Sequence, residues 1–140
     1  MIGILIITHG TLGESLIHGA SHVLNKRPPR LKQLGVTAQD DPVLLLPQAR
    51  AMVKDLDCGH GVLILTDMYG GSPSNIAAKL VIPGKIEAVA GLNLPMLIRA
   101  LTYRDKSLHT IVTKAVSGGC EGVMRVPPAL ATVRNAATGS

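Results

Sequence analysis

The sequence predicts an α/β domain with a parallel sheet and helices on both of its faces. Three observations predict this class. Continuous apolar runs alternate along the chain with segments whose apolar residues recur at helical spacing. The runs are rich in β-branched residues, which is typical of strands buried on both faces. At 140 residues the chain has the length of a single domain.

The N-terminal part of the chain begins with a strand, a helix and a second strand. Residues 2–7 are apolar and predict the first strand. The spacing of apolar residues predicts a helix over residues 13–24. These residues are Leu16, Ile17, Ala20, Val23 and Leu24. Residues 30–36 can form the second strand.

An Asp-Asp-Pro run at residues 40–42 supplies an N-cap and an N1 proline for a second helix. This helix is expected to reach about residue 56. Pro47 lies inside it and is expected to bend or delay it. Residues 61–65 are apolar and predict the third strand.

The remaining elements follow in the same alternation. A helix is predicted over residues 73–80, a fourth strand over 86–90 and another helix from 95 to 101. A last helix begins at residue 109 and is expected to end at the Gly118-Gly119 pair. One domain is therefore expected over residues 1–126, followed by a partly flexible tail at 127–140.

Composition excludes several classes of function. The net charge is +5, and much of the excess lies in residues 26–32, but the chain has two tyrosines and no Phe or Trp. Without aromatic stacking platforms, no nucleic-acid partner is expected. No apolar run reaches the length of a membrane span, and no signal peptide is recognisable. Cys58 and Cys120 are interpreted as reduced thiols of a cytoplasmic protein.

Ligands of open parallel sheets bind beyond the carboxyl ends of the strands. This rule places three loops on one rim of the predicted sheet, at residues 8–12, 66–74 and 91–94. It places the basic segment 26–32 at the opposite rim, away from any chemistry at the first three.

His9 is the first candidate for chemistry, because it stands where a buried strand hands over to a helix. Amides from Gly10 onward could bind an anion, and the helix dipole disfavours imidazolium, so that His9 would stay neutral and nucleophilic. Thr8 and Thr11 offer hydroxyl groups. A phosphate carrier, a metal ligand, a general base and a polar loop residue are all open at this point.

Asp67 ends the third strand as His9 ends the first. If the two strands are neighbours, this carboxylate can bond one ring N–H of His9 and leave the other nitrogen reactive. The alternative is that Asp67 only caps a turn or the next helix. In the GGSPSN segment that follows, Gly71 permits a tight turn, and Ser72 could cap a helix or bind phosphate oxygens.

Metal chemistry has weaker support. His18 and His22 are spaced i, i+4 and could share a helix face, but no third ligand is evident. No metal and no organic cofactor are expected. His60 and His109 are interpreted as structural or solvated side chains.

The chain resembles the mannose-type IIA domain of the bacterial phosphoenolpyruvate-dependent sugar phosphotransferase system (PTS). Three segments carry the resemblance at matching separations: a strand running into THG at residues 8–10, LTDMYGGSPSNIAAKL at 65–80, and AGLNLPMLIRAL at 90–101. The resemblance covers residues 1 to 120. Some sugar-transporting relatives have an aromatic residue where Thr11 stands here.

The resemblance implies a phosphotransferase of the carrier type. His9 would accept phosphate from phospho-HPr and pass it to a IIB protein, a separate chain because this one stops at Ser140. Asp67 would hydrogen-bond the active histidine, and Gly10, Thr11, Gly71 and Ser72 would bind the phosphate. The implied fold is a doubly wound sheet of four parallel strands plus an antiparallel edge strand.

The resemblance also implies a homodimer in which the edge strand, near residues 122–126, can be exchanged between subunits. Contact with the membrane would come only through a permease complex. Two other functions stay open: a regulatory module of an incomplete PTS whose His9 phosphorylation is read by a partner, and a small metal-dependent hydrolase that uses His9 and Asp67. The sugar cannot be identified from the sequence.

Overall fold

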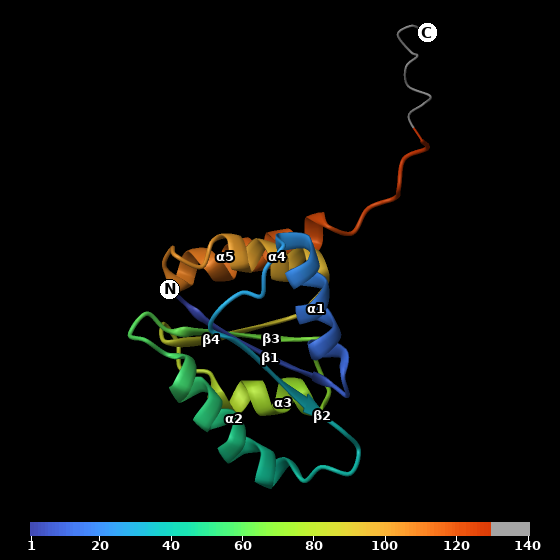
Figure 1. Cartoon of the computed structure of the whole chain (residues 1–140). Coiled ribbons are helices and arrows are strands. Elements are labelled where there is room, and N and C mark those ends of the chain that lie inside the picture. The colour runs from blue at the N-terminus through green and yellow to red at the C-terminus, as the bar shows by residue number, and fades with distance from the viewer. Residues whose placement is uncertain (130–140) are drawn as a thin grey trace, which may run out of the picture.

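A computed structural model of the chain describes residues 1–129 and shows one four-stranded sheet between two layers of helices (Figure 1). All of its strands are parallel, and their order is β2-β1-β3-β4. The strands are β1 (Gly3–His9), β2 (Leu31–Val36), β3 (Val62–Thr66) and β4 (Ile86–Ala90). The predicted class, α/β with a parallel sheet, is confirmed.

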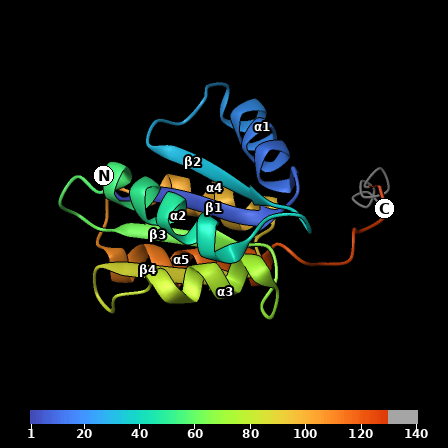
Figure 2. The same ribbon diagram turned by 90° about the horizontal axis from the view of Figure 1, so that it is seen from below.

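Five helices occur in the described part of the chain. They are α1 (Leu12–Leu24), α2 (Pro42–Leu56), α3 (Ser72–Leu80), α4 (Leu94–Thr102) and α5 (Leu108–Glu121). Helices α1, α4 and α5 cover one face of the sheet, and α2 and α3 cover the other (Figures 1 and 2). The helices therefore lie on both faces, as the alternation predicted.

The central strand β1 is buried on both sides because its side chains feed two separate cores. Ile4 and Ile6 pack beneath α1, α4 and α5, whereas Leu5 and Ile7 pack against α2 and α3. All four side chains are fully buried. Burial on both faces explains why this strand reads as a continuous apolar run rather than as an alternating one.

The start of α2 is as predicted, but Pro47 does not break the helix. Asp41 is the N-cap and accepts a hydrogen bond from the Val43 amide at 2.9 Å. The helix then continues through Pro47 to Leu56. An exposed position lets water compensate for the backbone hydrogen bond that a proline removes.

The last helix was predicted too short. Helix α5 runs to Glu121 and includes Gly118 and Gly119. A Cβ atom on Gly118 would lie 2.8 Å from Cβ of Arg99, and one on Gly119 would lie 2.6 Å from Cε of Met96. These glycines therefore allow close packing of α5 on α4 and do not terminate the helix.

The antiparallel edge strand expected near residues 122–126 is not found in the described chain. After α5, residues 123–129 form no strand and pair with none, and they lead away from the sheet (Figure 1). A lone segment without a hydrogen-bonding neighbour cannot form a sheet. Of the predicted tail 127–140, residues 130–140 lie outside the described residues.

Within residues 1–129, no helix combines the length and the apolar character needed to cross a membrane.

Candidate active site

Strand pairing brings the two predicted site residues together. His9 is the last residue of β1, and Asp67 directly follows β3. The two strands are neighbours, with Ile7 opposite Thr66, so both side chains emerge at the carboxyl rim of the sheet. Whether the strands were adjacent was open in the sequence, and the structure shows that they are.

His9 and Asp67 make a two-point contact. Oδ2 of Asp67 accepts a hydrogen bond from the His9 backbone N–H at 2.9 Å and one from ring Nδ1, also at 2.9 Å. The Met68 amide donates to the other carboxylate oxygen at 3.0 Å. The His9 side chain is 50% exposed and that of Asp67 only 11%, so the carboxylate is held beneath an accessible imidazole.

This arrangement fixes which ring nitrogen can react. Burial raises the pKa of the Asp67 carboxyl, but the hydrogen bonds from the backbone and ring of His9, the His9 charge and the Met68 amide outweigh burial, so this pKa lies below its ordinary value. A carboxylate only accepts hydrogen bonds, so Nδ1 carries the hydrogen. In the neutral ring the lone pair is therefore on Nε2.

Gly71 lies against the reactive edge of the ring. A Cβ atom on this residue would be 2.9 Å from Cε1 and 3.1 Å from Nε2 of His9. Its φ of −106° is accessible to any residue, so the requirement for glycine here is one of space. Nε2 thus faces the backbone where α3 begins.

The loop that carries Gly71 is fixed by Ser74 rather than by Ser72. The Ser74 hydroxyl accepts from the Gly70 amide at 2.8 Å and donates to the Gly71 carbonyl at 3.1 Å. The N-cap of α3 is Gly71, and Ser72 is an exposed first-turn residue that makes no capping bond. Of the two roles considered for Ser72, capping is therefore wrong, because the helix starts one residue earlier than expected, and phosphate binding stays a prediction.

The THG turn on the other side of His9 depends on close backbone approaches. Gly10 has a φ of +54° and donates its amide to the Val36 carbonyl. A Cβ atom on Gly35 would lie 2.2 Å from the Gly10 carbonyl oxygen, so β2 passes directly beneath the turn. The buried Thr8 hydroxyl accepts from the Gly13 amide at 2.8 Å and sets the start of α1. The sequence did contain a signal for this close approach. Gly35 lies inside the predicted second strand, and glycine in a strand often marks a place where another backbone comes near.

The two helices that begin beside His9 differ from the others in their caps. Asp41, Asn93 and Ser107 cap α2, α4 and α5 with their side chains. Thr11 and Gly71, the N-cap residues of α1 and α3, make no such bond. First-turn amides of a helix have no partner inside it, so these two N-termini can receive an anion, although at α1 the Gly13 amide already donates to Thr8.

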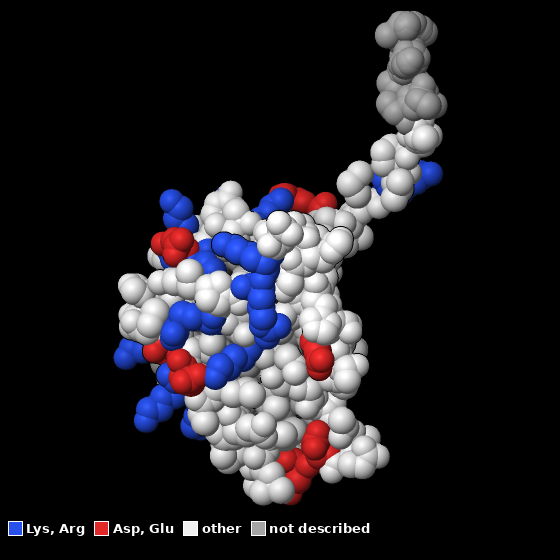
Figure 3. All heavy atoms as spheres, viewed as in Figure 1, with Lys and Arg blue, Asp and Glu red and all other residues white. Residues whose placement is uncertain are grey.

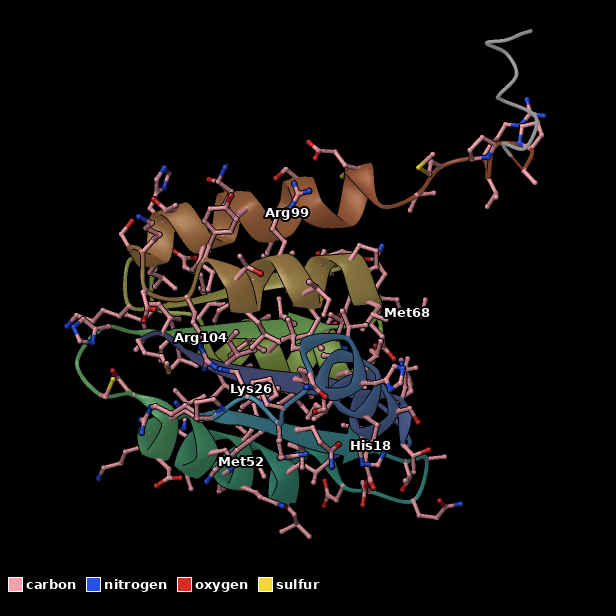
Figure 4. The ribbon with its side chains drawn as sticks, turned by 45° about the horizontal axis from the view of Figure 1, so that its top comes forward. His18, Lys26, Met52, Met68, Arg99 and Arg104 are labelled. Atoms are coloured by element: carbon pink, nitrogen blue, oxygen red, sulfur yellow. The ribbon has the colours of Figure 1, made fainter. Side chains whose placement is uncertain are left out.

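Exposed apolar side chains occur in the segments that follow β1 and β3, beside His9 and Asp67 in the chain. Leu12 is 44% exposed, Met68 57% and Tyr69 86%. Met68 projects from the end of the sheet in Figure 4. Apolar side chains exposed around a polar group indicate a contact surface for another protein.

The other histidines do not join the site. His18 and His22 lie on the exposed side of α1, and His109 lies in the first turn of α5. His60 is at the opposite rim, 3.6 Å from the Cys58 sulfur. In the described residues, no group of three or more His, Cys, Asp or Glu side chains is placed to hold a metal ion.

The fold and the site define an open α/β domain that carries a carboxylate-held, solvent-accessible histidine at the carboxyl rim of its sheet. Residues 3–116 match the family model described as "PTS system fructose IIA component". The chain belongs to this family.

Two relatives show how far the likeness extends. The mannose-specific EIIAB component of the PTS of Escherichia coli K12 is 35% identical over 125 residues, which are 87% of this chain and 38% of that protein. The chain thus spans less than two fifths of that relative's length. The fructose-specific EIIA component of Bacillus subtilis is 28% identical over 111 residues, 75% of this chain and 72% of that protein.

Solved structures agree on the fold. A PTS component EIIA from Streptococcus agalactiae superposes with a TM-score of 0.79 at 25% identity, covering 89% of this chain and 97% of that one. A mannose/sorbose-specific IIA subunit from Enterococcus faecalis gives 0.80 at 22% identity, covering 90% and 95%.

Proposed function

We propose that this IIA component is a phosphocarrier whose Nε2 of His9 accepts a phosphoryl group from phospho-HPr and passes it to a IIB protein. The observation that carries this proposal is that the two ring nitrogens of His9 have different surroundings. Asp67 holds Nδ1, and Nε2 belongs to a half-exposed side chain and lies beside Gly71, where α3 begins without a side-chain cap. We expect the reaction to take place in the cytoplasm.

The step needs no group beyond the two proteins. The Nε2 lone pair attacks the phosphorus of the donor's phosphohistidine, an N–P bond forms on His9, and the donor's N–P bond breaks with its electron pair returning to the donor ring. His9 keeps its hydrogen on Nδ1, so the phosphorylated ring is cationic. The Asp67 carboxylate balances that charge at 2.9 Å.

Phosphoryl transfer passes through a loose transition state, so the protein contributes mainly position and charge stabilisation. We expect the amides of Gly71, the N-cap of α3, and of Ser72 to donate to the phosphoryl oxygens, because Gly71 lies against Nε2. Amides at Gly10 and Thr11 flank the ring on the α1 side. The Gly10 amide, however, already donates to Val36 and the Gly13 amide to Thr8, which leaves that side to Thr11 and Leu12.

The test is to incubate the chain with enzyme I, HPr and phosphoenolpyruvate that carries a labelled phosphate. We expect one acid-labile label per chain, lost in His9→Ala and retained in His18→Ala, which changes an exposed histidine of α1. Label that persists in His9→Ala would overturn the proposal. A subsequent chase with a IIB protein would show whether the phosphate moves on.

We further propose that the chain forms a homodimer through β4. This strand ends the sheet, and its outer edge pairs with no strand in residues 1–129. Beyond α5, the exposed Val123, Met124 and Val126 supply an apolar segment that could add a strand to that edge in a second copy. Light scattering should give twice the chain mass, and removal of residues 123–140 should give the monomer. A monomeric full chain would contradict the dimer.

A further inference from the structure

A groove between α2 and α3 leads away from the site along the face of the sheet that they cover. Figure 2 shows the two helices side by side on that face. The groove has two connected hollows that share Pro42, Leu46 and Lys79. One hollow also includes Ser72, which directly follows Gly71, the glycine that lies against the His9 ring. The groove is therefore continuous with the candidate active site.

The floor and walls of the groove are largely apolar. Val43 is 75% exposed, and Pro42, Leu46, Pro47 and Ala51 add further apolar surface. Since Pro47 has no N–H, the carbonyl of Val43 lacks its helical hydrogen-bond partner and can accept from another molecule. From Pro42 to Lys54, α2 rises about 18 Å, enough to lie along roughly three turns of a second helix.

The charged side chains that line the groove all have one sign. They are Arg50, Lys54 and Lys79, and no acidic residue lines either hollow. All three are exposed, and none belongs to an ion pair of the described residues. The acidic pair Asp40 and Asp41 lies at the end of the groove near His9, where α2 begins, and thus opposite the end that holds Arg50 and Lys54. An occupant should therefore place its acidic side chains at the end remote from His9.

We propose that this groove docks an amphipathic helix of the protein that exchanges phosphate with His9. That helix would set apolar side chains between α2 and α3 and acidic side chains over Arg50, Lys54 and Lys79. Helix-in-groove recognition uses one apolar face in this way, and the flanking charges fix the direction. The identity of the partner rests on the proposed function, whereas the chemistry of the groove does not.

The test uses two labelled, end-capped peptides of 14 residues and the full chain. Both peptides carry leucines on one helix face. One has glutamates and the other lysines at the flanking positions. By fluorescence anisotropy at low salt, we expect the glutamate peptide to bind at least about tenfold more tightly than the lysine peptide. Equal affinities would overturn the proposal.

Two matched variants locate the binding. In Arg50→Glu/Lys54→Glu/Lys79→Glu we expect the preference for glutamate to be lost or inverted. A control, Lys26→Glu/Arg27→Glu/Lys106→Glu, makes the same change of net charge on exposed residues that do not line the groove and should retain the preference. Equal loss in both variants would show attraction by net charge alone and would overturn the proposal.

A last arm separates this inference from the proposed function. His9→Ala should bind the glutamate peptide like the native chain, because the ring does not line the groove. Excess glutamate peptide should slow phosphorylation of His9 in the native chain at least threefold. Absence of any label on His9 would refute the phosphocarrier but leave the peptide result standing. Labelling that the bound peptide does not slow would separate the groove from the phosphate exchange and overturn the docking proposal.

Discussion

At the scale of single residues, the two nitrogens of the His9 ring have unlike surroundings. Nδ1 is tied to a carboxylate that is almost buried, and Nε2 faces solvent and the backbone of Gly71. The same Asp67 oxygen also accepts from the His9 backbone amide, so the carboxylate is fixed relative to the ring. If the ring flipped or turned, it would lose its charge-assisted bond from Nδ1 to this oxygen. The reactive atom is therefore held in place before any donor arrives.

Replacing Asp67 with asparagine should separate positioning from packing. The amide has the same shape but no charge. With its NH2 group at the position of Oδ2 it would donate to Nδ1 and place the ring hydrogen on Nε2, but it would also face the His9 backbone N–H, which Oδ2 accepts in the native chain. We expect phosphorylation of His9 to slow by about 10- to 100-fold. Nitrogen-15 NMR should show the Nδ1–H tautomer in the native chain and more Nε2–H in the variant. An unchanged tautomer with an unchanged rate would contradict this account.

The same carboxylate predicts an acid dependence of stability. The pKa of Asp67 is lower in the folded chain than its ordinary value near 3.8, so the folded state favours its charged form. Its contribution is fully present above pH about 4. It is lost as the pH falls through the lowered value. Between pH 4 and 2, the free energy of unfolding should fall less steeply in Asp67→Asn than in the native chain, and parallel curves would contradict this.

Gly71→Ala should disturb the site and spare the fold. The new methyl group would meet Cε1 and Nε2 of His9, which end a half-exposed side chain that can move aside. Moving aside breaks the bond to Asp67, so we expect phosphorylation to slow at least about tenfold.

The control is Gly19→Ala, whose methyl would make ordinary contacts with Leu94 at 3.5 Å. It should keep full activity and unfold at the same or a higher temperature, since alanine favours helix over glycine. If Gly71→Ala is phosphorylated at the native rate, the close approach has no functional meaning.

Single-residue reasoning identified His9 and Asp67 because strand ends can be read from apolar runs, and parallel strands share a rim. It did not identify Gly71 as a neighbour of Nε2, since that contact depends on the path of the loop. It also considered Ser72 as a cap of α3, which it is not. The bond from Gly70 to Ser74 depends on where α3 begins, and element boundaries are poorly specified by local sequence.

At the scale of elements, Arg104 joins the starts of two strands to the α4–α5 connection. It is 4% exposed and donates to three backbone carbonyls, those of Ile2, Pro29 and Arg30, at 2.6 to 3.2 Å. Burial lowers the pKa of its guanidinium, but arginine stays protonated in proteins. Figure 4 shows Arg104 near Lys26, in the region of the basic loop.

Arg104→Met should destabilise the domain by about 2–4 kcal/mol, because the carbonyls lose their donors in a buried place. Chemical denaturation would measure the loss. The matched control is Arg99→Met, which removes an ion pair with Glu121 near the surface and should cost less than about 1 kcal/mol. Equal losses would show that Arg104 contributes no more than a surface cation.

The elements themselves were predictable in order and type, because each is long and strongly patterned. The glycines of α5 show where local sequence patterns fail to predict the end of a helix. Glycine is a frequent helix terminator, and nothing local distinguishes Gly118 and Gly119 from a stop signal. Their reason is tertiary: Arg99 and Met96 of α4 occupy the space of a side chain. Contacts between elements decided what local propensity could not.

At the scale of the whole molecule, charge separates the two ends of the sheet. Loops at the His9 end (10–11, 37–41, 67–71 and 91–93) hold three aspartates and no Lys or Arg. Those at the other end (25–30, 57–61, 81–85 and 103–107) hold six Lys or Arg and two aspartates. Figure 3 shows most of the visible cations gathered on one side of the domain, with a further cation on the segment that extends away from it. The sequence predicted that the basic segment 26–32 lies away from His9. The net charge of the whole chain, however, does not reveal that the loops at the His9 end are acidic.

A chain of net charge +5 should repel a basic partner, yet its His9 end should attract one. The rim favours a donor with basic side chains around its phosphohistidine. We therefore expect transfer from phospho-HPr to slow as salt rises, because the Debye length shortens to about 10 Å at 0.1 M. Asp40→Asn/Asp41→Asn should slow transfer about two- to tenfold at low salt and flatten the salt dependence.

Both substitutions keep the local bonds, since asparagine also caps helices and can accept from the Thr37 amide as Asp40 does. The control, Asp55→Asn/Asp105→Asn, raises the net charge equally but lies far from the His9 rim, and it should leave the rate unchanged. If the first pair accelerates transfer, the donor meets this rim through acidic side chains. If both pairs act alike, only the total charge matters, and the separation of charge between the two ends does not guide the encounter.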